Sequence, residues 1–135
     1  MRLLVVSVGR LRAPYADDVA HYEKLLSRYV RLETLELRDA RVLPRRLPVD
    51  GFITLLDAGG ASYDSVGFAG FLGARRDSGQ DLTFVLGGAH GLELAGAEHR
   101  LSLGPMTLPH QLARVVLLEQ LYRAHKIILG EPYHY

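Results

Sequence analysis

The feature that most constrains the fold is a series of short, predominantly apolar segments. Residues 3–8, 52–56 and 82–86 are runs of this kind, and less regular runs lie at residues 31–38 and 100–103. Apolar runs of about four to eight residues bounded by turn signals are typical of strands buried on both faces. We therefore predict five strands at these positions, with the third ending at Asp57 before a turn at Gly59 and Gly60.

The segments between these runs have a different periodicity. Apolar residues recur at helical spacing, and helices are predicted over residues 14–29, 62–76, 92–98 and 109–128. Residues 39–50 contain two prolines and are predicted to be irregular. Strands that alternate with helices predict an α/β fold, with a mostly parallel sheet and helices on both faces.

Length and composition define the class of protein. The 135 residues are 48% hydrophobic and 23% charged, which predicts one globular domain over residues 1–135. No apolar run approaches the ~18 residues that cross a membrane. The apolar segment 3–8 is followed at once by Arg10 and Arg12, so it is a poor secretory signal. With no cysteine, disulfides and thiolate catalysis are excluded, and we expect a cytoplasmic protein.

The basic residues are unevenly chosen and unevenly placed. Of the 16 basic side chains, 14 are Arg, and they are concentrated in residues 1–50 and 100–135, while residues 51–99 are acidic. Arg is suited to bidentate contacts with phosphate and to stacking on bases. A nucleic-acid partner is therefore compatible with the composition, although a bias toward Arg codons explains it equally well.

Three stretches follow predicted strands, at the edge where ligands bind in parallel sheets. They are residues 57–60, 87–91 and 104–110. Glycines at 87 and 88 allow close approach of a ligand to the backbone, although an ordinary turn has the same composition. The loop before the last helix is stiffened by Pro105 and Pro109, and Thr107 is predicted to cap that helix. A rigid apolar loop beside a Gly-Gly turn suits an adenine ring.

The six histidines do not form a metal motif, and no metal is expected. Two of them lie at places of interest, because His110 follows the stiff loop and His134 lies in the aromatic tail with Tyr133 and Tyr135. A tail of this composition is more consistent with docking or stacking than with a frayed end.

Several segments together are similar to a known family. They are Met1–Gly9, Thr54–Asp57, Phe84–Gly91, Leu101–His110, the helix with Arg114, Glu119 and Leu121–Ala124, and the closing Pro132–His134. With these motifs the chain resembles the ribosomal RNA large subunit methyltransferase H family, the 23S rRNA pseudouridine-N3 methyltransferases of the SPOUT superfamily. The resemblance covers nearly the whole chain.

The resemblance implies a trefoil knot near the carboxyl end, a homodimer, and S-adenosylmethionine as the methyl donor. The cofactor contacts that it implies are Leu56, Gly88, Gly104, Pro105, Met106, Thr107, Leu108 and Pro109. On the RNA side it implies His110, Arg123, Tyr133 and His134. Pseudouridine N3 must lose a proton, and either His110 or His134 is a candidate base, unless solvent accepts the proton. The expected partner is 23S rRNA in the large subunit or the assembled ribosome.

A homodimer is also predicted from the last helix. Its apolar residues cover more than one stripe, and they are Leu112, Val115, Val116, Leu117, Leu118, Leu121, Tyr122 and Ile128. The tail residues Tyr133 and His134 are expected to lie over the cofactor pocket and contact the target base, helped by a basic residue of the partner subunit.

Two features depart from the family pattern and leave alternatives open. The connection at residues 39–50 is short where family members have a long charged helix, and the segment between Gly91 and Leu101 is also shortened. Both concern docking to the ribosome rather than the cofactor loops. A non-catalytic RNA-binding or ribosome-assembly protein of the same fold is one alternative, and a SPOUT methyltransferase acting on transfer RNA is another.

Overall fold

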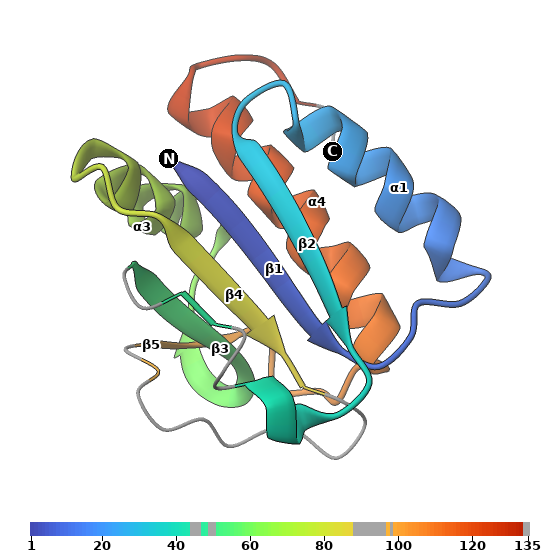
Figure 1. Cartoon of the computed structure of the whole chain (residues 1–135). Helices are drawn as coiled ribbons and strands as arrows, with labels where there is room; N and C mark the ends of the chain where they lie inside the picture. Colours follow the sequence, from blue (N-terminus) through green and yellow to red (C-terminus); the bar gives the residue numbers. More distant parts are fainter. Residues whose placement is uncertain (44–46, 49–50, 88–96, 98, 134–135) are drawn as a thin grey trace.

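The computed structural model describes residues 1–43, 47–48, 51–87, 97 and 99–133. Its strands are β1 (Arg2–Val8), β2 (Arg31–Leu37), β3 (Phe52–Ser62), β4 (Leu82–Leu86) and β5 (His99–Ser102). Its helices are α1 (Tyr15–Leu26), α3 (Ser65–Asp77), α4 (His110–Ile128) and the single-turn 3₁₀ helix η1 (Ala40–Val42), as Figure 1 shows.

The five strands form one sheet in the order β2-β1-β4-β3-β5, and every neighbouring pair is parallel. The predicted α/β architecture is therefore confirmed. Strands β1 and β4 lie inside the sheet, and every residue of β4 is buried, which explains why their sequences are almost continuously apolar. Strand β2 is at one edge and alternates buried or half-buried residues with exposed ones.

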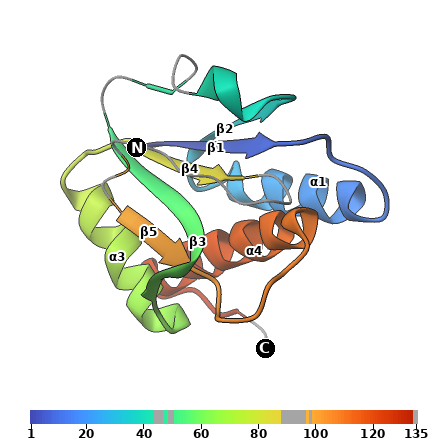
Figure 2. The ribbon, with the colours of Figure 1, turned by 90° about the horizontal axis from the view of Figure 1, so that it is seen from below.

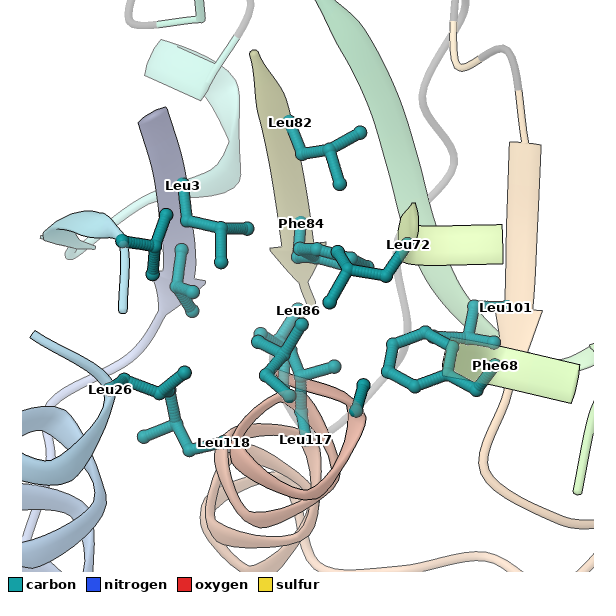
Figure 3. Packing of buried hydrophobic residues seen from close by; sticks show 14 of the residues in the cluster. Leu3, Leu26, Phe68, Leu72, Leu82, Phe84, Leu86, Leu101, Leu117 and Leu118 are labelled. Carbon is teal, nitrogen blue, oxygen red and sulfur yellow. The ribbon is translucent and has the colours of Figure 1, made fainter. Parts of the chain in front are cut away.

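The two faces of the sheet are covered differently. Helices α1, α3 and α4 lie together on one side, and η1 lies on the other (Figure 2). In Figure 3, Leu117 of α4 lies against Leu86 of β4, and Leu118 lies beside Leu26 of α1. Helices were expected on both faces of the sheet. Within the described residues, one face carries three α-helices and the other carries only η1, where Leu43 is fully buried.

The position of α4 accounts for its broad apolar surface. The helix packs against α1 on one side, α3 on the other and the sheet above, and Leu117, Leu118 and Leu121 are fully buried within this chain. Its apolar pattern therefore does not by itself require a second subunit. No helix in the described part of the chain is long and apolar enough to cross a membrane.

Strand β3 is longer than predicted, and the turn predicted at Gly59 and Gly60 is wrong. Its pairing with β5 is interrupted after Leu56 and resumes at Ala61, so residues 57–60 form a bulge inside the strand. A Cβ atom at Gly60 would lie 2.6 Å from the carbonyl carbon of Arg100. Glycine is required there because the two backbones touch, which the sequence alone does not reveal.

Two predictions lie outside the described residues. The helix predicted at residues 92–98 falls almost entirely on them, and the trefoil knot depends on the course of the chain through residues 88–96.

Candidate active site

A pocket opens at the carboxyl edge of the sheet, toward which the arrowheads of β1, β2 and β4 point in Figure 1. It has a volume of about 190 Å³. It is lined by Leu56, Asp57, Ala58, Leu86, Gly87, Leu101, Leu103, Gly104, Met106, Thr107, Leu108, His110 and Ala113. We call this the edge pocket. All three stretches selected from the sequence contribute to it.

The cofactor contacts implied by the resemblance divide into three groups. Leu56, Gly104, Met106, Thr107 and Leu108 line the edge pocket. Pro105 lines a neighbouring groove instead, and Pro109 is the residue that precedes α4. Gly88 lies outside the described residues. Five of the eight residues are therefore gathered around one hollow.

The loop between β5 and α4 is braced internally but leaves backbone groups unused. The Ser102 hydroxyl donates to the carbonyl of Gly104 at 3.1 Å and accepts from its amide at 3.0 Å. In the described part of the chain, the amides of Met106, Thr107 and Leu108 donate to no backbone carbonyl. Amides left free beside an apolar hollow are available to a ligand that offers acceptors.

The predicted capping role of Thr107 is wrong. Helix α4 begins at His110, its N-cap is Pro109, and no side chain caps it. Thr107 precedes the cap by two residues and lines the edge pocket. The first turn of α4 thus keeps unpaired amides, which stabilise partial negative charge nearby.

Asp57 is a pocket residue that the sequence analysis did not select as a site residue. Its carboxylate accepts from the amide of Gly59 at 3.1 Å and from Nη1 of Arg100 at 2.9 Å. The hydrogen bond from Gly59, followed by that from Arg100, lowers the pKa of Asp57 below its ordinary value. The signal that could have identified it is a carboxylate directly after a buried strand at the ligand-binding edge.

His110 lies at the rim of the edge pocket and is placed there by Gly9. A Cβ atom at Gly9 would lie 3.4 Å from Nε2 of His110, so the imidazole packs directly on the glycine backbone. Gly9 has a φ of +112°, and its amide donates to the carbonyl of Leu37 at 2.8 Å. The turn after β1 therefore fixes one side of the histidine. The second candidate base, His134, lies outside the described residues.

Arg123 and Tyr133 form a cluster with Glu119 and Tyr122, which we call the tail cluster. The Tyr133 hydroxyl donates to Oε2 of Glu119 at 2.7 Å, and Nη2 of Arg123 lies 3.1 Å from the same oxygen. The Arg123 guanidinium carbon lies 4.2 Å from the centre of the Tyr133 ring, which meets Tyr122 edge-on at 5.3 Å. Burial, and then the bond to Glu119, raises the pKa of Tyr133.

Within its own chain the tail cluster does not lie over the edge pocket, and the expectation that Tyr133 and His134 lie over a cofactor pocket stays a prediction. The chain reverses at Gly130, which has a φ of +67°, and this returns Tyr133 to the side of α4. Arg123 is near the far end of α4, about 20 Å along the helix axis from His110. Within one chain the two sets of residues are therefore separate.

The described histidines also give no metal centre. No group of three or more potential metal ligands occurs among the described residues. His125 is fully buried, its Nδ1 lies 2.8 Å from the carbonyl of Leu121, and burial lowers its pKa. His99 stacks on Phe71 at 4.8 Å. Both histidine side chains are therefore packed within the fold.

Comparison with known proteins identifies the relatives of this chain. Residues 1–134 match a family described as "Predicted SPOUT methyltransferase". A protein of Gemmatimonas aurantiaca named "Ribosomal RNA large subunit methyltransferase H" is 42% identical, with 99% of each chain covered. A protein of the same name from Acidiphilium cryptum is 42% identical over 98% of this chain and 93% of its own, and one from Carboxydothermus hydrogenoformans is 39% identical over 99% of each.

Proposed function

Since this chain belongs to the SPOUT methyltransferase family, we propose that it transfers a methyl group from S-adenosylmethionine to N3 of a pseudouridine in 23S rRNA. The observation that carries the proposal is the edge pocket, in which three separate loops converge at the ligand-binding edge of the sheet. Relatives at about 40% identity named as ribosomal RNA large subunit methyltransferases support the substrate. We place the activity in the cytoplasm, with the ribosome as partner.

The described residues fit the proposed cofactor. Leucines at 56, 86, 101, 103 and 108 give the pocket an apolar wall that suits a purine ring. The amides of Met106, Thr107 and Leu108 donate to no backbone carbonyl among the described residues and can donate to ring nitrogens, as the carbonyls of the same loop can accept from an exocyclic amine. Gly88 remains a predicted contact, because Gly87 at the end of β4 already lines the pocket.

When bound, S-adenosylmethionine supplies an activated methyl group. The chain has to hold the acceptor nitrogen in line with that group and provide for the departure of the N3 proton. His110 is placed at the rim of the pocket by Gly9, and a neutral imidazole there would accept the proton. His134 is the alternative base, and water is the third acceptor.

We further propose a homodimer in which Arg123, Tyr133 and His134 serve the edge pocket of the partner subunit. The separation of about 20 Å between His110 and Arg123 along α4 supports this arrangement, since a two-fold axis can bring opposite ends of two helices together. A groove of about 540 Å³ lies beside the edge pocket, between the start of α3 and the middle of α4. Its apolar side chains Tyr63, Phe68, Pro105 and Val116 offer a surface for a second copy.

The proposal is tested by binding and transfer measured separately. Calorimetry should show one S-adenosylmethionine per chain, whereas a non-catalytic RNA-binding protein of this fold would show none. Methyl transfer should then be measured on ribosomes, isolated 23S rRNA and transfer RNA. Transfer to 23S rRNA in ribosomes, located at N3 of a pseudouridine by mass mapping, supports the proposal. Transfer only to transfer RNA would contradict it.

A further inference from the structure

Three exposed arginines follow β1 and β2 at the carboxyl edge of the sheet, and nothing described so far uses them. Arg10 and Arg12 follow β1, and Arg38 follows β2, whose last residues pair with those of β1. In the described part of the chain, none of the three has an ion pair, a side-chain hydrogen bond or an aromatic partner. We call these three residues the arginine edge.

The backbone that carries the arginine edge is held in place. Three bonds do this: Gly9 N to Leu37 O at 2.8 Å, Leu11 N to Glu36 Oε2 at 3.0 Å, and Arg12 N to Gln111 Oε1 at 2.6 Å. They tie the turn after β1 to β2 and to the first turn of α4. The arginine side chains therefore project from a backbone that is already ordered, so RNA binding does not have to order it. Their charged heads remain in solvent.

Acidic residues near the arginine edge are engaged elsewhere or lie at its border. Glu36 accepts from Leu11 and faces the buried Arg114, whose Nη1 lies 3.8 Å from Oε1 of Glu36. Asp39 pairs with Arg41. Asp17 and Asp18 lie in the first turn of α1, beyond the turn that carries Arg12. The edge thus keeps an excess of positive charge.

The arginine edge is directly connected to the reacting end of α4. Gly9, next to Arg10, packs on His110, and the amide of Arg12 is bound by Gln111, the residue after His110. An RNA strand that reaches the edge pocket from this side has to pass the three guanidinium groups. Arg forms bidentate hydrogen bonds with phosphate and remains charged at any physiological pH.

We propose that Arg10, Arg12 and Arg38 bind the phosphate backbone of the substrate RNA and hold it beside the edge pocket. This proposal rests on the proposed function, because it takes the bound polyanion to be the substrate RNA. It assigns a docking surface on this chain that neither the tail cluster nor the pocket provides. The contacts are to phosphates, so they set position and affinity rather than sequence preference.

The test is the salt dependence of RNA binding by the full chain. The variant replaces Arg10, Arg12 and Arg38 by Gln, and the probe is a labelled uridine oligomer of about 20 nucleotides. Each phosphate contact on a single strand contributes about 0.7 to the slope of log K against log salt, so three lost contacts should lower the slope by about 2. At about 0.15 M salt the same change corresponds to a roughly 50-fold loss of affinity.

A matched control removes the same charge from the opposite edge of the sheet. Lys24, Arg28 and Arg31 are exposed near the end of α1 and the start of β2, and replacing them by Gln gives the same net charge as the first variant. The control should keep the parental slope. An unchanged slope in the arginine-edge variant, or an equal loss in the control, would overturn the proposal.

The proposed function and the proposed docking surface can be disproved separately. S-adenosylmethionine affinity, measured by calorimetry, should be parental in both variants and shows that they fold. If the parent transfers no methyl group to ribosomal RNA, the proposed function fails, yet the difference in salt slope between the two variants would still be expected. If transfer is present and the slopes are equal, only the docking surface is wrong.

Discussion

The two halves of α4 have different surroundings. At the His110 end the surroundings are apolar and open, and the amides of residues 106–108, which donate to no backbone carbonyl among the described residues, belong to the loop that lines the edge pocket. From the middle of α4 onward, Glu119 accepts from the Tyr133 hydroxyl and pairs with Arg123, whose guanidinium lies over the Tyr133 ring. The surroundings of His110 suit a ligand, whereas the hydrogen bond from Tyr133 to Glu119 fixes the direction of the tail.

The two halves of α4 therefore suit different tasks in methyl transfer. Methyl transfer needs its reacting atoms about 3 Å apart, while His110 and Arg123 are separated by about 20 Å along α4. If both sets of residues serve one reaction, as we propose, they have to come from different chains. In the proposed homodimer, the tail of each subunit would serve the edge pocket of the other.

The largest effect is expected from Gly60→Val, which breaks the pocket end through its backbone. The new Cβ would lie 2.6 Å from the Arg100 carbonyl carbon, so β3 and β5 must separate and Asp57 must move. We expect a loss of about 3 kcal/mol or more in the free energy of unfolding and no detectable cofactor binding. Urea unfolding and calorimetry measure the two.

Gly70→Ala is the control for that substitution. Gly70 lies within α3 with nothing within 4 Å of a new Cβ atom. Alanine should stabilise the helix by about 0.5–1 kcal/mol. If both glycine variants behave alike, the bulge does not position the pocket.

The next effect concerns the proton at the pocket end. If His110 accepts it, His110→Gln should lower kcat about 100-fold or more, with little change in cofactor affinity, because the apolar wall is intact. The rate of methyl transfer at saturating cofactor is the measurement. A parental rate would assign the proton to His134 or to water, and His134→Gln distinguishes these two.

In the tail cluster, a chain ending at Pro132 removes Tyr133 together with the residues that follow it. Loss of a base-stacking contact should reduce methyl transfer about 10- to 100-fold, while cofactor affinity changes far less. Tyr133→Phe keeps the ring over Arg123 and removes only the bond to Glu119, so its effect should be smaller. Transfer at the parental rate by the truncated chain would make the tail a passive terminus.

The smallest effect is expected at His125, which is buried between α4 and its neighbours. Burial lowers its pKa, so as the pH falls through about 6.5 the unfolded chain takes up a proton that the folded chain excludes. The free energy of unfolding should therefore fall between pH 7 and pH 5.5, and less steeply in His125→Leu. His99, whose pKa is also lowered by burial, leaves a residual slope. Equal slopes in parent and variant would contradict this.

The sequence predicted the parts of the fold that depend on local pattern. Strands β1 and β4 were found because they are buried on both faces, which makes their sequences continuously apolar. The length of β3 was missed because Gly59 and Gly60 have the composition of a turn. Their actual role depends on contact with Arg100, far along the chain, and no local rule contains that information.

The site shows the same division. The three loops of the edge pocket were predicted, since parallel strands direct their following residues to one edge. The pair of Asp57 with Arg100, and the bond of Tyr133 to Glu119, were not, because each joins elements whose spacing only the fold determines. The resemblance named Arg123 and Tyr133 but could not show that they lie together at the far end of α4.

The central claim is that each active site combines the pocket of one subunit with the tail of the other. It is tested by mixing two defective chains, one with Ala58→Trp, which fills the exposed wall of the edge pocket, and one ending at Pro132. Each chain alone should transfer methyl groups poorly. After subunit exchange, half of the dimers contain one pocket and one tail that are both intact, so the mixture should regain about a quarter of the parental rate. A mixture no more active than its separate components would contradict the account.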